Sequence, residues 1–285
     1  MQTSCKQGTN LTRAATRFKE AARGRRVKGW LADRCVRSGS TAARRILRAS
    51  STDQGVARRA RGISMDHAKA ANFWQTVLDQ ADVLRAPLSC TPEDAGWDEV
   101  VTQVTTAMET LDAAVREVDE RLGVEATQAP VPDGGLIQLA ITCGCNVDAI
   151  DAVLALVDAA PVLPASLTVC AFKPPVPADV ISSFGTMQFA GQEVAFDAIR
   201  FIARPSEDEA GKYDIVCFAP NEAQTPFDEG VPGSMAVQMV LGMGIGEFKL
   251  MTRIGQIGVV LSDDPPDGSV TSWELNELME RTSLH

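Results

Sequence analysis

The sequence predicts an α+β fold in which two N-terminal amphipathic helices lead into a mixed β-sheet with helices packed on it. Three observations support this prediction: helical spacing of apolar residues over 66–122, a β-α-β pattern over 136–172, and two alternating, strand-like segments within 199–218. The chain has 285 residues, 45% of them hydrophobic, and a mean hydropathy of -0.02. These values are typical of a globular protein with a buried core.

Charge divides the chain into two parts. Residues 1–64 contain 16 Lys or Arg and 3 Asp or Glu, a net charge of +13, whereas residues 65–285 contain 11 and 34, a net charge of -23. We therefore predict a basic, disordered arm over 1–64 and a single acidic α+β domain over 65–285. An arm rich in Arg and Ser has three interpretations: translation that truly begins at Met65, an organelle-targeting segment, or an expressed tail that binds nucleic acid or an anionic membrane.

Two helices open the acidic part. The first is predicted over 66–85 and ends before Pro87, and the capping sequence from Thr91 to Asp94 predicts the start of a second that extends to about residue 122. Packing of the second helix on its own domain is favoured over a dimerising coiled coil, because its apolar stripe covers only about three heptads. The apolar faces comprise Ala70, Phe73, Trp74, Val77, Leu78 and Ala81 in the first helix, and Val101, Val104, Met108, Leu111, Val115, Val118 and Leu122 in the second.

A β-α-β unit follows a loop rich in Pro and Gly at 126–135. Residues 136–142 form an apolar, strand-like run, Asn146 caps a helix that Pro161 ends, and residues 167–172 form a second strand. The connection is long enough for a right-handed crossover, so these two strands are predicted to be parallel.

The remaining elements are shorter. Residues 199–203 and 213–218 flank an acidic loop and predict a hairpin. No internal repeat is detectable. The other predicted elements are strands at 186–189, 248–252 and 257–261, and helices at 235–243 and 273–281.

Several classes of protein are excluded or disfavoured. No apolar run reaches the roughly 20 residues of a membrane-spanning helix, so an integral membrane protein is excluded. The seven cysteines are scattered and odd in number, which is typical of reduced thiols in a cytoplasmic protein; an organelle is the alternative if the arm is a transit peptide. His67 and His285 are the only histidines, so we predict no metal site, and no motif indicates a cofactor.

The candidate functional residues lie at the carboxyl end of the β-α-β strands. Cys143, Cys145 and Asn146 follow the first strand and Lys173 follows the second, so they could line one pocket. The two thiols lie on one side of an extended segment next to a helix N-terminus, although a purely structural role is favoured. The glycines of Gly242-Met-Gly-Ile-Gly246 follow a helical run, so they indicate a helix end and a tight turn rather than a phosphate-binding loop.

The order of elements and several short motifs resemble a family of uncharacterised bacterial α+β cytosolic proteins. The similar pieces are Asn72-Phe-Trp74, the segment 159–164 leading into a strand that ends Ala171-Phe-Lys-Pro174, and Gly246-Glu-Phe248 followed by 252–255. The resemblance covers about residues 65–261 and implies a compact cytosolic domain without an assigned activity. The strand at 140–145 is less polar than the family pattern.

Two functions remain open. The first is a non-enzymatic protein-interaction or regulatory module whose acidic surface attracts a basic protein partner, for example in an immunity-like role. The alternative is an enzyme acting on a small substrate in the pocket of Cys143, Cys145, Asn146 and Lys173.

Overall fold

The computed structural model confirms the α+β class. The arm predicted over 1–64 and most of the loop predicted over 126–135 lie outside the described residues. The sequence predicts one domain over 65–285; residue contacts divide its described part into a first unit, residues 65–142 and 152–171, and a second unit, residues 143–151 and 172–282. The structure describes residues 65–91, 93–128, 136–189, 191–226, 228 and 230–282.

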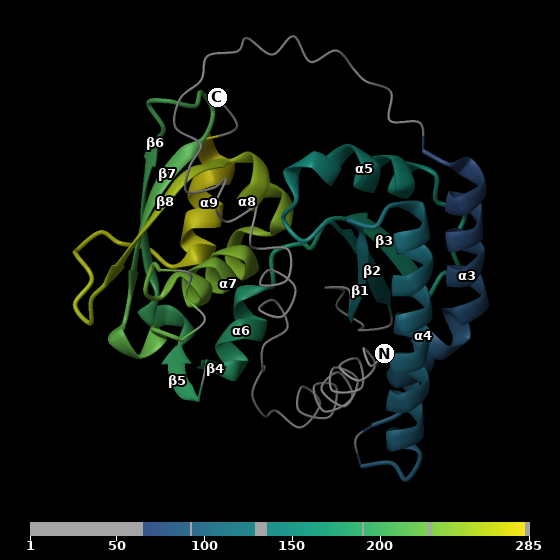
Figure 1. The fold of residues 1–285 in the computed structure, drawn as a ribbon. Coiled ribbons are helices and arrows are strands. Elements are labelled where there is room, and N and C mark those ends of the chain that lie inside the picture. The colour runs from purple at the N-terminus through teal and green to yellow at the C-terminus, as the bar shows by residue number, and fades with distance from the viewer. Residues whose placement is uncertain are drawn as a thin grey trace, which may run out of the picture. The chain divides into compact units, whose positions relative to one another are not determined.

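The first unit combines three helices with a three-stranded sheet (Figure 1). Strand β1 pairs with β2 antiparallel, and β2 pairs with β3 parallel, with Ile137 opposite Leu167 and Ile141 opposite Ala171. The crossover between the parallel strands runs through α5, as the β-α-β pattern predicts. The elements are α3 (His67–Arg85), α4 (Trp97–Val118), β1 (Gly123–Gln128), β2 (Ile137–Thr142), α5 (Ile150–Asp158) and β3 (Leu167–Ala171), with the 3-10 helix η1 (Ala86–Ser89). The 3-10 helix η2 (Val147–Ala149), which precedes α5, belongs to the second unit.

The first two helices of this unit, α3 and α4, begin differently. Asp66 caps α3, because its carboxylate accepts hydrogen bonds from the N–H groups of Ala68 and Lys69. The start predicted for the second helix is wrong: α4 begins at Trp97, and Thr91 donates its N–H and hydroxyl to Asp94. The capping sequence therefore stabilises a turn that precedes the helix.

The sequence predicts a loop at 126–135, but residues 126–128 belong to strand β1. Its residues Gly123–Gln128 alternate weakly, with Val124 buried and Glu125 and Thr127 more exposed. Such a pattern carries little local strand preference, so pairing with the strongly apolar β2 determines the structure of this segment.

The second unit contains two small sheets and four helices. The predicted hairpin is confirmed, because β6 and β7 pair antiparallel from Arg200 opposite Phe218 to Pro205 opposite Tyr213. Its elements are α6 (Ala178–Phe184), β4 (Thr186–Phe189), β5 (Gln192–Ala195), η3 (Phe196–Ala198), β6 (Arg200–Pro205), β7 (Tyr213–Ala219), η4 (Asn221–Ala223), α7 (Ser234–Ile245), α8 (Glu247–Thr252), β8 (Ile254–Leu261) and α9 (Ser272–Thr282).

The strand predicted at 248–252 is helical. Gly246, with a φ of 80°, ends α7, and its carbonyl then accepts the N–H of Leu250 to close the first turn of α8. Helical spacing places Glu247 and Met251 on the same buried face of α8. Residues four apart also share a face in a strand, so their apolar or buried character alone could not separate the two structures.

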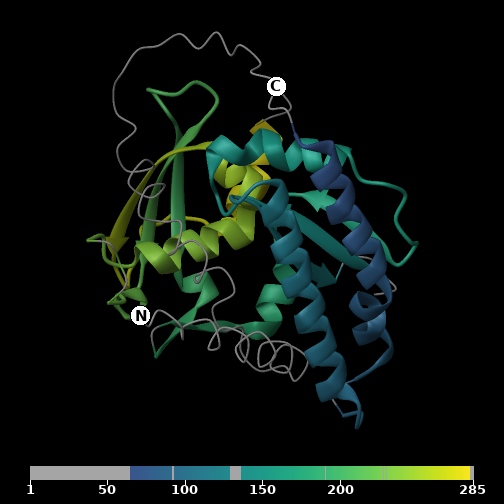
Figure 2. The same ribbon diagram turned by 45° about the vertical axis from the view of Figure 1, so that its right-hand side comes forward.

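The two units share one topology, although the sequence contains no detectable internal repeat. In both, an antiparallel strand pair is followed by a helical crossover to a third, parallel strand, in the orders β1-β2-β3 and β6-β7-β8. The helices α7 and α8 form the crossover of the second unit, which Figure 2 shows in a second view. The fold therefore contains a second β-α-β unit, whose parallel strands end at Ala219 and Leu261.

Helix α7 is the centre of the second unit's core. Eight of its twelve residues are buried, and they pack with side chains from the sheet and from α9. Its own N–H and C=O groups are satisfied within the helix, so it can be apolar on all sides. None of the helices in the described part of the chain has the length and hydropathy needed to cross a bilayer.

Candidate functional site

The first candidate site surrounds Glu247, at the junction of α7 and α8. Its side chain is 2% exposed. One carboxylate oxygen accepts the backbone N–H of Cys143 and of Cys145, each at 3.1 Å, and the other accepts the N–H of Lys173 at 3.0 Å. All of these residues belong to the second unit, so the contacts lie within one compact body.

The two loops around Glu247 have unusual backbone conformations. Gly144 and Cys145 have φ values of 59° and 63°, and Phe172, next to Lys173, has a φ of 67°. Positive φ is strained for residues other than glycine and is maintained only where surrounding contacts require it. In these two loops the positive φ values turn the backbone N–H groups toward one point. The N–H groups together form a concave anion-binding nest.

The thiol of Cys143 is close to this carboxylate but poorly suited to nucleophilic chemistry. Its Sγ lies 3.7 Å from a carboxylate oxygen of Glu247 and 3.7 Å from the sulfur of Met251. Burial, and then the negative charge of Glu247, raise the pKa of Cys143 to about 12. The thiol therefore stays protonated at neutral pH, whereas nucleophilic attack requires the thiolate.

The structure brings three of the four predicted site residues together, but through their backbones. Cys143, Cys145 and Lys173 each donate an N–H to Glu247, whereas the side chain of Asn146 accepts the N–H of Asp148 and caps η2. Sequence reasoning missed Glu247. The signal was a single acidic residue directly after the long apolar run of α7, where a charge needs a buried partner.

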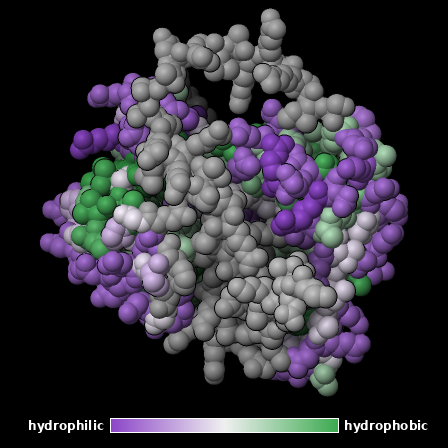
Figure 3. Space-filling model, in the orientation of Figure 1, coloured by the Kyte–Doolittle hydropathy of each residue, from purple (hydrophilic) through white to green (hydrophobic). Residues whose placement is uncertain are grey.

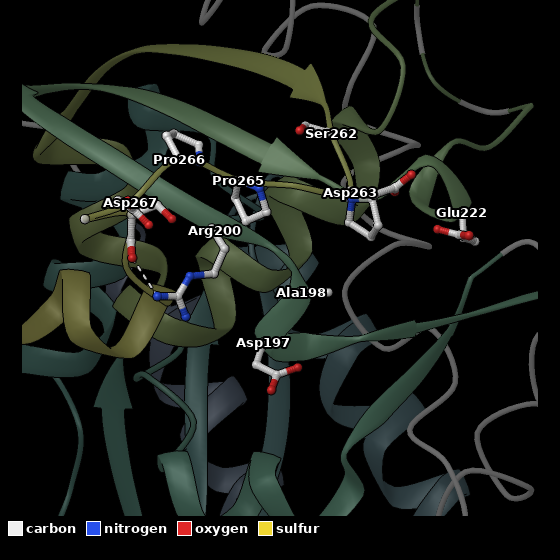
Figure 4. A pocket seen from close by; sticks show the side chains of 12 residues that line it. Asp197, Ala198, Arg200, Glu222, Ser262, Asp263, Pro265, Pro266 and Asp267 are labelled. Carbon is white, nitrogen blue, oxygen red and sulfur yellow. Dashed lines mark hydrogen bonds between the residues drawn. The ribbon is translucent and has the colours of Figure 1, made fainter.

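A second candidate site lies at the carboxyl end of the parallel pair β7 and β8. An open pocket of about 660 Å³ is formed there by the segments that follow these strands and by the start of β6 (Figure 4). Ligands of α/β sheets often bind at this end of parallel strands, and the volume is within the range of small-molecule pockets. The pocket is lined by Asp197, Ala198, Arg200, Pro220, Glu222, Ser262, Asp263, Pro265, Pro266, Asp267, Gly268 and Ser269.

Carboxylates dominate the charge of this pocket. Asp197, Glu222 and Asp267 are exposed, and none of them has a hydrogen bond or ion pair with another described residue. Asp263 instead accepts two hydrogen bonds from Asn221, one from its backbone N–H at 3.0 Å and one from its side-chain amide at 2.6 Å. Three of the four carboxylates are therefore available to a ligand.

The cation of the pocket is already engaged. The guanidinium of Arg200 donates to the carbonyl oxygen of Ser269 at 2.6 Å (Figure 4) and lies 3.9 Å from the carboxylate of Glu274. A single bound guanidinium leaves the four acidic side chains with an excess of negative charge. This arrangement favours a positively charged ligand.

Neither site has the ligand set of a metal centre: within the described ranges, no group of three or more His, Cys, Asp or Glu side chains is placed to hold a metal ion. Comparison with known proteins gives no further guidance, since no protein-family model, no curated protein and no solved structure matches the chain.

Proposed function

We propose that this chain is a non-enzymatic interaction module that binds an electropositive protein partner, and that the pocket at the ends of β7 and β8 receives a basic side chain of that partner. The observation that carries the proposal is the group of three unpaired carboxylates, Asp197, Glu222 and Asp267, around one open pocket. A Lys or Arg side chain fits the volume, and its N–H groups match carboxylate acceptors.

The charge of the surrounding chain supports the same proposal. Residues 65–285 carry a net charge of -23, which attracts cationic partners and raises their rate of encounter.

The alternative of an enzyme that uses Cys143 has less support. The anion-binding nest beside this thiol holds the chain's own carboxylate, from Glu247, and the raised pKa of Cys143 keeps the thiol protonated. A small anionic substrate would have to displace a side chain that is 2% exposed.

The test is binding of a fluorescent oligo-arginine peptide, measured by anisotropy with the full chain. A triple variant, Asp197→Asn with Glu222→Gln and Asp267→Asn, removes the unpaired carboxylates without changing side-chain size. We expect its affinity to fall by about tenfold or more, because charge-assisted hydrogen bonds are lost.

A matched control separates the pocket from the general charge of the chain. The variant Glu109→Gln with Glu117→Gln and Glu120→Gln removes the same number of exposed negative charges from the first unit. We expect it to retain most of the wild-type affinity. Equal losses in both triple variants would mean that the peptide responds to net charge alone, and the pocket would have no role.

A further inference from the structure

We propose that Asp267 is a site of spontaneous isomerisation, at which the chain converts aspartate into isoaspartate without an enzyme. The reaction needs a side-chain carboxyl group and, on the next residue, a backbone N–H that is free to attack it. Asp267 is followed by Gly268 in the segment after β8, on the wall of the acidic pocket (Figure 4). Glycine has no Cβ, so nothing on that residue obstructs the attack.

The turn that contains these two residues leaves both reacting groups free. The N–H of Ser269 donates to the carbonyl oxygen of Pro266 at 3.2 Å, and Gly268 has a φ of 81° whereas the φ of Asp267 is not positive. This is a type II turn, in which the central N–H takes no part in the hydrogen bond of the turn. Among the described residues, neither the N–H of Gly268 nor the carboxylate of Asp267 has a hydrogen-bond partner.

The turn is also accessible to water. Asp267 and Gly268 are both exposed, and Figure 3 shows hydrophilic residues on much of the surface of the second unit, on the left of the view. Ring closure requires rotation about the Cα–C bond of Asp267. The turn hydrogen bond that this rotation breaks contributes about 1 kcal/mol, so the folded chain should react nearly as readily as an unfolded segment.

The reaction proceeds in two steps and needs only water. First the nitrogen of Gly268 bonds to the Cγ of Asp267 and loses its proton, the Cγ–OH bond breaks, and water leaves a five-membered succinimide. Water then adds to one of the two ring carbonyls and breaks the bond of that carbonyl to the nitrogen. Addition at Cγ restores aspartate, whereas addition at the main-chain carbonyl leaves the chain running through Cγ and releases the former main-chain carbonyl as a free carboxylate.

The neighbouring aspartates lack these free groups. The carboxylate of Asp263 accepts two hydrogen bonds, and the N–H of the next residue donates to the hydroxyl of Ser262 at 3.2 Å. Asp264 is followed by Pro265, which has no N–H. All three aspartates are exposed in one segment, but only Asp267 combines a free carboxylate with a free N–H on the next residue.

The test is incubation of the full chain at physiological pH and temperature for several weeks, with samples digested by trypsin at intervals. One tryptic peptide, residues 254–281, contains all three aspartates. Isoaspartate has the same mass as aspartate but changes the retention of the peptide, and electron-transfer dissociation identifies its position. We expect isoaspartate to accumulate at Asp267, at a rate within about tenfold of that in a synthetic peptide of the same sequence, and to stay undetected at Asp263 and Asp264.

Two variants test the chemistry of the turn. Asp267→Asn forms the same succinimide by releasing ammonia and should react faster, because an amide, unlike a carboxylate, is open to attack at neutral pH; its peptide binding is therefore measured on fresh protein. In Gly268→Ala the Cβ meets no other atom within 4 Å, and circular dichroism checks that the variant is folded. Its methyl group should slow the isomerisation about tenfold. Isomerisation more than tenfold slower in the folded chain than in the synthetic peptide, or equally fast at all three aspartates, would overturn the proposal.

The effect on the pocket rests on the proposed function, whereas the isomerisation itself does not. Isoaspartate adds a methylene group to the main chain at Asp267 and moves the carboxylate, with no change in net charge. We expect a chain enriched in isoaspartate to bind oligo-arginine about threefold or more weakly than fresh chain, because a charge-assisted hydrogen bond is displaced. Unchanged binding would exclude Asp267 from the proposed binding site, while the peptide analysis would still establish the isomerisation.

Discussion

At the scale of single residues, Glu247 is the side chain on which the local structure of two loops depends. It accepts three backbone N–H groups in a site from which water is largely excluded. Glu247→Ala leaves these donors unsatisfied, so we expect the free energy of unfolding to fall by about 3 kcal/mol or more. Urea denaturation measures the change.

Two further variants test this interpretation of Glu247. Glu247→Gln retains an oxygen for Cys143 and Cys145 but places an amide against the N–H of Lys173, so its loss of stability should be intermediate. Glu280→Ala removes an exposed carboxylate paired with Lys249 and should cost less than about 1 kcal/mol. If Glu247→Ala were no more destabilising than Glu280→Ala, the nest would not require its carboxylate.

The thiol of Cys143 gives a second prediction at this scale. With its pKa raised to about 12, only about one molecule in ten thousand carries the thiolate at pH 8. We expect iodoacetamide to leave Cys143 and the buried Cys217 unmodified in the folded protein, and to modify both in denaturant. Mass spectrometry of the peptides measures this, and rapid modification of Cys143 in the native protein would restore it as a candidate nucleophile.

The sequence is enough to predict where the candidate site residues lie, but not what each of them does. Alternating strand and helix patterns are enough to place Cys143, Cys145 and Lys173 at one end of a parallel pair. The sequence could not reveal that their N–H groups matter more than their side chains, because that depends on backbone angles at Cys145 and Phe172. Glu247 comes from a distant segment, so only the folded structure brings it to them.

At the scale of elements, two glycines of α7 have opposite roles. A Cβ at Gly244 would lie 2.7 Å from the carbonyl carbon of Ser272 and closer still to its hydroxyl, whereas a Cβ at Gly242 meets only the side chain of Leu250, at 3.6 Å. Gly244→Ala should therefore separate α7 from α9 and lower stability by about 2 kcal/mol. Gly242→Ala should raise it by about 0.5 kcal/mol, because alanine favours the helix.

Thermal unfolding followed by circular dichroism compares the two variants. The pair is well matched, because both changes add one methyl group to the same helix. A loss of stability in both would indicate that the helix backbone, rather than contact with Ser272, requires glycine.

The elements that the sequence predicted wrongly have weak local patterns. Most helices and the hairpin of β6 and β7 follow from strong periodicity. Strand β1 has few apolar residues and depends on β2 for its structure, and the six residues of α8 are too few to separate helical from alternating spacing. The error at α8 hid the second β-α-β unit, and with it the strand end where the acidic pocket lies.

At the scale of the whole molecule, the two units repeat a topology without repeating residues. Each has an antiparallel pair, a helical crossover and a parallel third strand. The equivalent strand ends carry different chemistry: the amides of Cys143, Cys145 and Lys173 hold an anion in one place, and free carboxylates line the other. Topology can be preserved while side chains differ, so comparison of residues alone does not detect it.

Net charge makes binding of a basic peptide sensitive to salt. The chain carries a net charge of -10, so it attracts a basic peptide. Screening reduces this attraction as the Debye length falls from about 10 Å at 0.1 M to about 3 Å at 1 M salt. Added sodium chloride should therefore weaken oligo-arginine binding, which anisotropy measures at each salt concentration. If salt strengthened peptide binding, the carboxylates of the pocket would not be its basis.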